Sequence, residues 1–147
     1  MKLKEKLTNY FKNRPATFYF AFATACLTFV SSIIYVSMFA GSELISWGAF
    51  VCAFLALFAF FALSLFDMPK IGAISMAVLS FTAFIMLLIS AYSFVYDEVN
   101  IIAMGSEASS KFINMVVCVV LYLITFIFAN ICAWLRLVKR PKEENNG

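Results

Sequence analysis

The stretch ATFYFAFATACLTFVSSIIYVSMF, residues 16–39, decides the fold, because it contains no Asp, Glu, Lys or Arg. A helix rises about 1.5 Å per residue, so roughly 20 apolar residues cross the hydrocarbon core of a bilayer. Three more stretches without a charged residue follow at about 44–66, 71–95 and 112–135. The sequence therefore predicts an all-α integral membrane protein with four transmembrane helices.

The composition indicates one membrane domain that takes up the whole chain, 1–147. Of its 147 residues, 64% are hydrophobic and 13% are charged, against about 45–50% and 25% in soluble domains. The segments between the apolar stretches are too short to bury a core of their own. The first stretch is longer than the signal-peptide h-region of about 7–15 residues, so we expect it to be retained.

The basic residues predict the orientation of the helices. Of the 11 basic residues, all but Lys111 fall on one side of the predicted membrane helices. They are Lys2, Lys4, Lys6, Lys12, Arg14, Lys70, Arg136, Lys139, Arg140 and Lys142. Because basic residues accumulate on the cytoplasmic side, both termini and the tail 136–147 are predicted to be cytoplasmic in a multi-pass protein of the plasma membrane.

The segment at about 2–14 has the pattern of an interfacial helix. Leu3, Leu7, Tyr10 and Phe11 recur at helical spacing, and lysines occupy the remaining positions. Such an amphipathic helix lies in the membrane surface and is attracted by anionic lipid. We expect it to anchor the N-terminus on the cytoplasmic face, with lipid sensing or partner docking as the alternative role.

Each predicted membrane helix has a face of small or weakly polar residues opposite a face of bulky apolar residues. In the second helix the small face comprises Gly48, Cys52, Ala56, Ala59 and Ala62. Helices in lipid associate through close packing at small residues, and short connections of about four residues join antiparallel neighbours. We therefore expect a left-handed, antiparallel four-transmembrane-helix bundle with the small faces inward.

The small face of the first helix is rich in hydroxyl groups. Thr24, Thr28, Ser31 and Tyr35 share it, and a row of this kind is a candidate polar path for a neutral or weakly charged solute. The competing interpretation is that these hydroxyls bond to carbonyls of their own helix or hold neighbouring helices together. We favour the second interpretation.

Two asparagines in the fourth helix are candidate partner contacts. Asn114 lies on the small face near its outer end, whereas Asn130 lies on nearly the opposite side of the helical wheel. An amide in hydrocarbon needs a hydrogen-bonding partner. Asn130 is therefore predicted to face lipid or a second protein.

The sequence offers little support for a catalytic or metal-binding site. Asp97 and Glu98, in an expected outer loop at 96–110, form a candidate acidic site whose oxygens suit a divalent ion, although solvated helix-end residues are commoner. The predicted spans contain hydroxyls and thiols but no His, Lys or carboxylate that would activate them. The chain has no histidine, which excludes a Cys/His metal site. We expect no catalytic residue, cofactor or metal.

These observations favour a non-catalytic role. The expected function is that of a small accessory or interaction subunit, whose partners are the bilayer and another membrane protein or a second copy of itself. The alternative is an oligomeric channel or carrier for a neutral or weakly charged solute, built around the hydroxyl face of the first helix. Nucleic acid is not an expected partner, because the basic residues lie beside the membrane helices.

Overall fold

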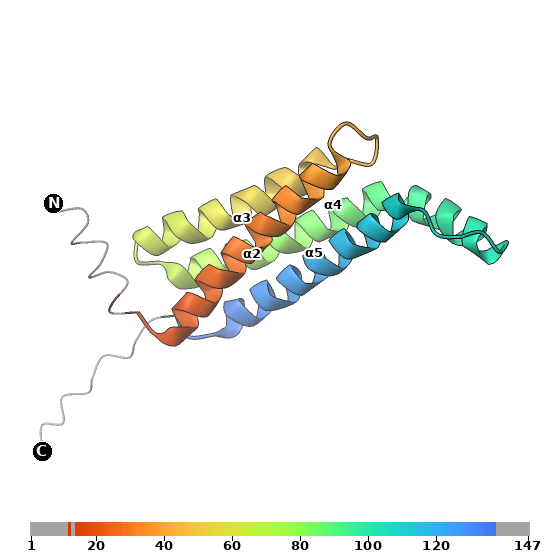
Figure 1. Ribbon diagram of the computed structural model, residues 1–147. Coiled ribbons are helices and arrows are strands. Elements are labelled where there is room, and N and C mark those ends of the chain that lie inside the picture. The colour runs from red at the N-terminus through yellow and green to blue at the C-terminus, as the bar shows by residue number, and fades with distance from the viewer. Residues whose placement is uncertain (1–11, 13, 138–147) are drawn as a thin grey trace, which may run out of the picture.

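The computed structural model describes residue 12 and residues 14–137, and it is helical. Its helices are α2 (Ala16–Phe39), α3 (Trp47–Leu65), α4 (Pro69–Ala103) and α5 (Ser110–Trp134). They pack side by side, and the chain reverses direction at each connection (Figure 1). All four are long and apolar enough to cross a membrane, which confirms the all-helical prediction with four candidate spans.

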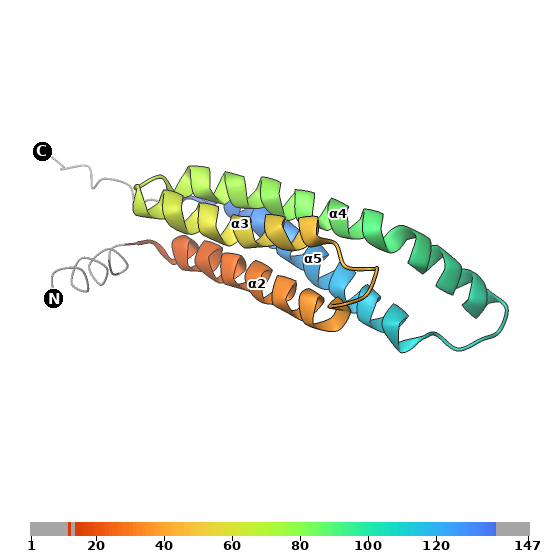
Figure 2. The same ribbon diagram turned by 90° about the horizontal axis from the view of Figure 1, so that it is seen from above.

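The helices close a ring in which each packs on its two neighbours. α3 contacts α4, α4 contacts α5, and α2 contacts both α3 and α5, whereas α2 and α4 touch only narrowly across the middle. The beginning of α2 and the end of α5 lie at one end of this bundle, here called the terminal end (Figure 2). The opposite end, which holds Gly41 and Gly105, is called the far end.

The helix boundaries follow from local capping chemistry. The hydroxyl oxygens of Ser46 and Ser109 accept hydrogen bonds from the backbone N–H groups three residues later, at 3.3 and 3.2 Å, and so cap α3 and α5. Pro69 occupies the first turn of α4, where its missing N–H costs nothing. α4 ends at Ala103, and two residues later Gly105 has a φ of 91°, a left-handed conformation that suits glycine.

The small inward faces predicted for α2 and α5 are buried, but those predicted for α3 and α4 are rotated. On α4, Ser93 of the predicted small face is exposed, whereas Met76 and Leu87 are buried. On α3, Ala62 is exposed, while Phe60 is fully buried.

Gly72 of α4 lies against the backbone of Phe60: a Cβ at Gly72 would be 3.1 Å from its carbonyl oxygen and 3.2 Å from its Cα. The glycine thus lets α3 and α4 approach closely at this level, and the Phe60 ring packs on Phe18 of α2 with centroids 5.8 Å apart. The α3 sequence alone does not reveal this pairing.

The expected loop at 96–110 is mostly helix, which corrects the sequence prediction. α4 continues to Ala103, so only residues 104–109 connect it to α5. The apolar stretch ends at residue 95, but residues 96–104 include neither proline nor glycine, and the next glycine is Gly105. Hydropathy marks where a helix leaves hydrocarbon and says nothing of where it ends.

The interfacial helix predicted at about 2–14 falls almost entirely outside the described residues. The first long helix of the described residues begins at Ala16, and it is itself a candidate membrane span.

The α4–α5 hairpin extends beyond the α2–α3 turn at the far end. A Cβ at Gly48 would be 2.5 Å from the sulfur of Met86, so the first turn of α3 is level with Met86 of α4. From Met86 to Ala103, α4 runs on for about 25 Å at 1.5 Å per residue.

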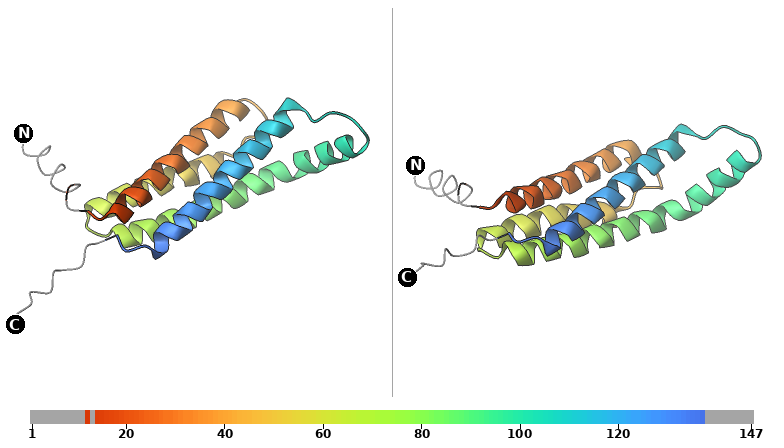
Figure 3. Two further views of the ribbon diagram at one scale, coloured as in Figure 1. Left: turned by 60° about the horizontal axis from the view of Figure 1, so that its bottom comes forward. Right: turned by 90° about the horizontal axis from the view of Figure 1, so that it is seen from below.

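This part of α4, with the first turns of α5 and their connection (residues 87–120), is called the overhang (Figures 1 and 3). Its inner residues, such as Leu87 and Cys118, are buried beside the end of α2, and its outer part projects.

Candidate functional site

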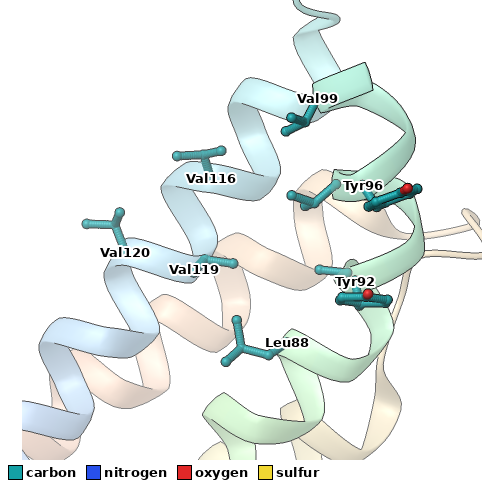
Figure 4. Close-up of a pocket in the computed structure, with 9 residues that line it drawn as sticks. Leu88, Tyr92, Tyr96, Val99, Val116, Val119 and Val120 are labelled. Carbon is teal, nitrogen blue, oxygen red and sulfur yellow. The ribbon is translucent and has the colours of Figure 1, made fainter. Parts of the chain in front are cut away.

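The overhang contains a groove between α4 and α5. Its volume is about 520 Å³, and its walls come from both helices (Figure 4). The lining residues are Leu88, Ala91, Tyr92, Val95, Tyr96 and Val99 of α4 with Val116, Val119 and Val120 of α5. Apart from the two tyrosine hydroxyls, every side chain that lines it is a hydrocarbon.

The groove exists because α4 bends and moves away from α5. α4 changes direction within the overhang (Figures 1 and 3). The hydroxyl of Ser90 donates to the carbonyl of Leu87 at 2.9 Å, and a serine that bonds back to its own helix in this way is a common cause of bending. Beyond the bend, the rings of Tyr92 and Tyr96 stack with centroids 6.4 Å apart.

Glu98 fixes the tip of the overhang. One carboxylate oxygen accepts a hydrogen bond from the Ser109 hydroxyl at 2.8 Å, and the other accepts from the Ser109 backbone N–H at 3.4 Å. Ser109 is itself the N-cap of α5, and a carboxylate is favoured beside the positive end of a helix dipole. Glu98 therefore joins the two ends of the 104–109 connection.

The two residues of the candidate acidic site thus have different surroundings. Glu98 is half-buried and bonded to Ser109, whereas Asp97 is exposed. Among residues 12 and 14–137, no group of three or more His, Cys, Asp or Glu side chains has a geometry that could hold a metal ion. The structure gives Glu98 a capping contact, which the sequence pattern did not predict.

The candidate polar path lies inside the bundle. Thr24, Thr28, Ser31 and Tyr35 are all buried. The first three hydroxyls donate to carbonyls of α2 itself, at 2.9, 2.9 and 2.8 Å. The hydroxyl of Tyr35 donates to the Leu44 carbonyl at 2.9 Å and accepts from the Ser46 N–H at 2.6 Å. These residues share one face, as expected, but that face packs against the chain's own helices.

The two candidate partner contacts are both half-buried. The side-chain amide of Asn130 donates to the carbonyl of Phe126, four residues earlier on α5, at 2.9 Å. Asn114 lies in the second turn of α5, at the level of the overhang. Asn130 is therefore partly satisfied within its own helix.

The structure also reveals a buried tyrosine that the sequence analysis did not single out. Tyr122 of α5 is 2% exposed, and its ring lies edge-on to Tyr35 with centroids 6.0 Å apart. Its hydroxyl has no hydrogen-bond partner among the described residues. A tyrosine in the middle of an apolar stretch was the available signal, because a buried phenol normally finds a partner.

Polar contacts close the terminal end of the bundle. Arg14 forms an ion pair with Asp67 and lies over the ring of Phe18. The Lys70 ammonium donates to the carbonyls of Ala133 and Leu135, the latter at 3.3 Å. A cation is favoured at the negative end of a helix dipole, so Lys70 caps α5. These basic residues have structural partners in addition to any role in orientation.

The four cysteines are free thiols. The thiol of Cys132 donates to the hydroxyl of Thr24 at 3.5 Å, which links α5 to α2. Comparison of the chain with known protein families, with curated proteins and with solved structures finds no match.

Proposed function

We propose that this chain is a multi-pass protein of the plasma membrane that acts as a non-catalytic interaction subunit. Four helices of spanning length and composition support insertion. Of the described basic residues, Arg14, Lys70 and Arg136 lie at the terminal end and Lys111 lies at the start of α5. This excess supports cytoplasmic termini in an antiparallel four-transmembrane-helix bundle.

The observation that carries the proposal is the apolar surface at the tip of the overhang. Met104 is 85% exposed, and Ile101 and Ile113 are exposed as well. α3 has 19 residues, about 28 Å at 1.5 Å per residue, and so matches a hydrocarbon core of about 30 Å. The charge-free stretch of α4 ends at residue 95, and Ala103 lies about 12 Å further along the helix at 1.5 Å per residue, so the tip stands outside that core.

Apolar side chains exposed outside the hydrocarbon mark a contact site for another protein. The partner that fits is a second membrane protein with an apolar patch on the same side of the membrane, opposite the termini. The chain would act by holding or stabilising that partner, because the hydroxyls of Thr24, Thr28 and Ser31 bond to their own helix and Glu98 bonds to Ser109.

A pull-down with matched variants tests this function. The tagged full-length protein is recovered from its native membrane in mild detergent, together with Met104→Glu and Met68→Glu. Met68 is 51% exposed at the terminal end, so Met68→Glu controls for the added charge. Wild type and Met68→Glu should retain a second protein in fixed ratio, and Met104→Glu should lose it. Equal recovery by all three variants would contradict the proposal.

The alternative of an oligomeric channel around the hydroxyl face of α2 has weaker support. That face is buried within one copy of the chain, and its hydroxyls already donate to helix carbonyls. Solute flux through liposomes that contain the purified protein alone would restore this alternative.

A further inference from the structure

The groove of the overhang lies at a defined depth if the bundle spans a membrane. Its innermost lining residue, Leu88, is two positions past Met86, which is level with the end of α3. Its outermost residue on α4, Val99, lies about 16 Å further along the helix at 1.5 Å per residue. The groove therefore begins in the outer part of the hydrocarbon core and, past the end of the charge-free stretch of α4 at residue 95, rises into the head-group region on the side away from the termini.

The lining of the groove suits an apolar occupant. Its side chains are aliphatic except for Tyr92 and Tyr96, and an apolar hollow of this kind excludes water and accepts hydrocarbon. Tyrosines are enriched where a bilayer meets water, because their rings are apolar and their hydroxyls are polar. The two hydroxyls are thus placed where the glycerol and phosphate groups of a lipid lie.

The size of the groove distinguishes a lipid chain from a protein helix. A helix with its side chains is about 10 Å or more across, so a segment 16 Å long occupies about 1,200 Å³. This is more than twice the 520 Å³ of the groove. A single extended hydrocarbon chain is narrow enough to enter between α4 and α5 without moving them apart.

We propose that the groove holds one acyl chain of a phospholipid from the leaflet opposite the termini. This inference rests on the membrane insertion proposed above, but it does not require the protein partner. Neither Asp97 nor Glu98 lines the groove, so the site recognises the chain and not the charge of the head group. Phosphatidylethanolamine and phosphatidylglycerol should therefore occupy it equally.

Photolabelling of the purified full-length protein in nanodiscs tests the proposal. The probe is a phospholipid with a diazirine in the middle of one acyl chain, and adducts are located by mass spectrometry. Adducts should concentrate on Leu88, Tyr92 and Val119, above the level at Phe58, an exposed residue of α3 that lines a smaller apolar hollow of about 360 Å³ between α2 and α3. Labelling of Phe58 at the same level or higher would overturn the lipid site.

Matched variants separate a specific site from general lipid contact. Val116 lines the groove and Val117 does not, although they are 42% and 43% exposed on the same helix. Val116→Trp combined with Val120→Trp should reduce groove adducts about five-fold, because the added rings fill the volume. Val117→Trp combined with Ile124→Trp should leave them unchanged. Equal labelling in both double variants would contradict the proposal.

The outcomes also separate this inference from the proposed function. Labelling at Phe58 without labelling of the groove overturns the lipid site and leaves membrane insertion standing. Absence of labelling at both positions contradicts insertion itself. If a photoreactive amino acid at Tyr92 captures a protein in native membranes in place of lipid, the groove is a protein-docking site and the acyl-chain proposal is wrong.

Discussion

Tyr35 and Tyr122 are neighbouring buried phenols whose hydroxyls have opposite surroundings. The Tyr35 hydroxyl makes two hydrogen bonds to the connection between α2 and α3, with Leu44 and Ser46. The Tyr122 hydroxyl has no partner among the described residues. Replacing each tyrosine by phenylalanine removes one oxygen and leaves the ring packing intact.

The expected energies follow from these contacts. Each hydrogen bond contributes about 0.5–1.5 kcal/mol net, so Tyr35→Phe should lower the free energy of unfolding by about 1–3 kcal/mol. Burying a hydroxyl without a partner costs about 1–3 kcal/mol, so Tyr122→Phe should be neutral or should stabilise the protein by about 1 kcal/mol. The changes in the free energy of unfolding should thus have opposite signs, or the loss for Tyr35→Phe should be clearly the larger.

Unfolding in mixed detergent–SDS micelles measures the difference, with tryptophan fluorescence and helical circular dichroism as signals. Tyr92→Phe is the control, because Tyr92 is 73% exposed and its substitution should change the free energy of unfolding little. A larger loss for Tyr122→Phe than for Tyr35→Phe would refute the assignment of the hydrogen bonds.

Three further substitutions test other contacts. Lys70→Met should lower the free energy of unfolding by about 0.3–1 kcal/mol, because the C-terminus of α5 loses its cation. In the same assay Lys70→Arg should keep most of this stabilisation, because the positive charge remains. Gly72→Val should cost about 1–3 kcal/mol by forcing α3 and α4 apart, and an unchanged melting temperature would show that they do not pack there. Glu98→Gln should speed amide hydrogen exchange in the 104–109 connection by weakening the bonds to Ser109, whereas Asp97→Asn should not; equal effects would contradict the different roles of the two acids.

The sequence was sufficient for the features that depend on local pattern. The limits predicted for the first helix, 16–39, coincide with those of α2, because a proline precedes the helix and apolar residues fill it. The burial of Thr24 and Thr28 was also predictable, since small residues at helical spacing form the packing face.

The features that depend on contacts between helices were not predictable in this way. The close approach of α3 to α4 at Phe60 requires Gly72 on the other helix, and the capping role of Glu98 requires Ser109 across the connection. The groove depends on the bend of α4 relative to α5. A helical wheel treats each helix as straight and isolated, so it cannot place any of the three.

Photocrosslinking from position 104 in native membranes tests the central claim most directly. A photoreactive amino acid replaces Met104, which is the most exposed apolar residue of the overhang tip, and the products are identified by mass spectrometry. The proposed function predicts a crosslink to one other membrane protein, with none from the same amino acid at position 68. Adducts with lipid alone, or only with a second copy of the chain, would contradict it.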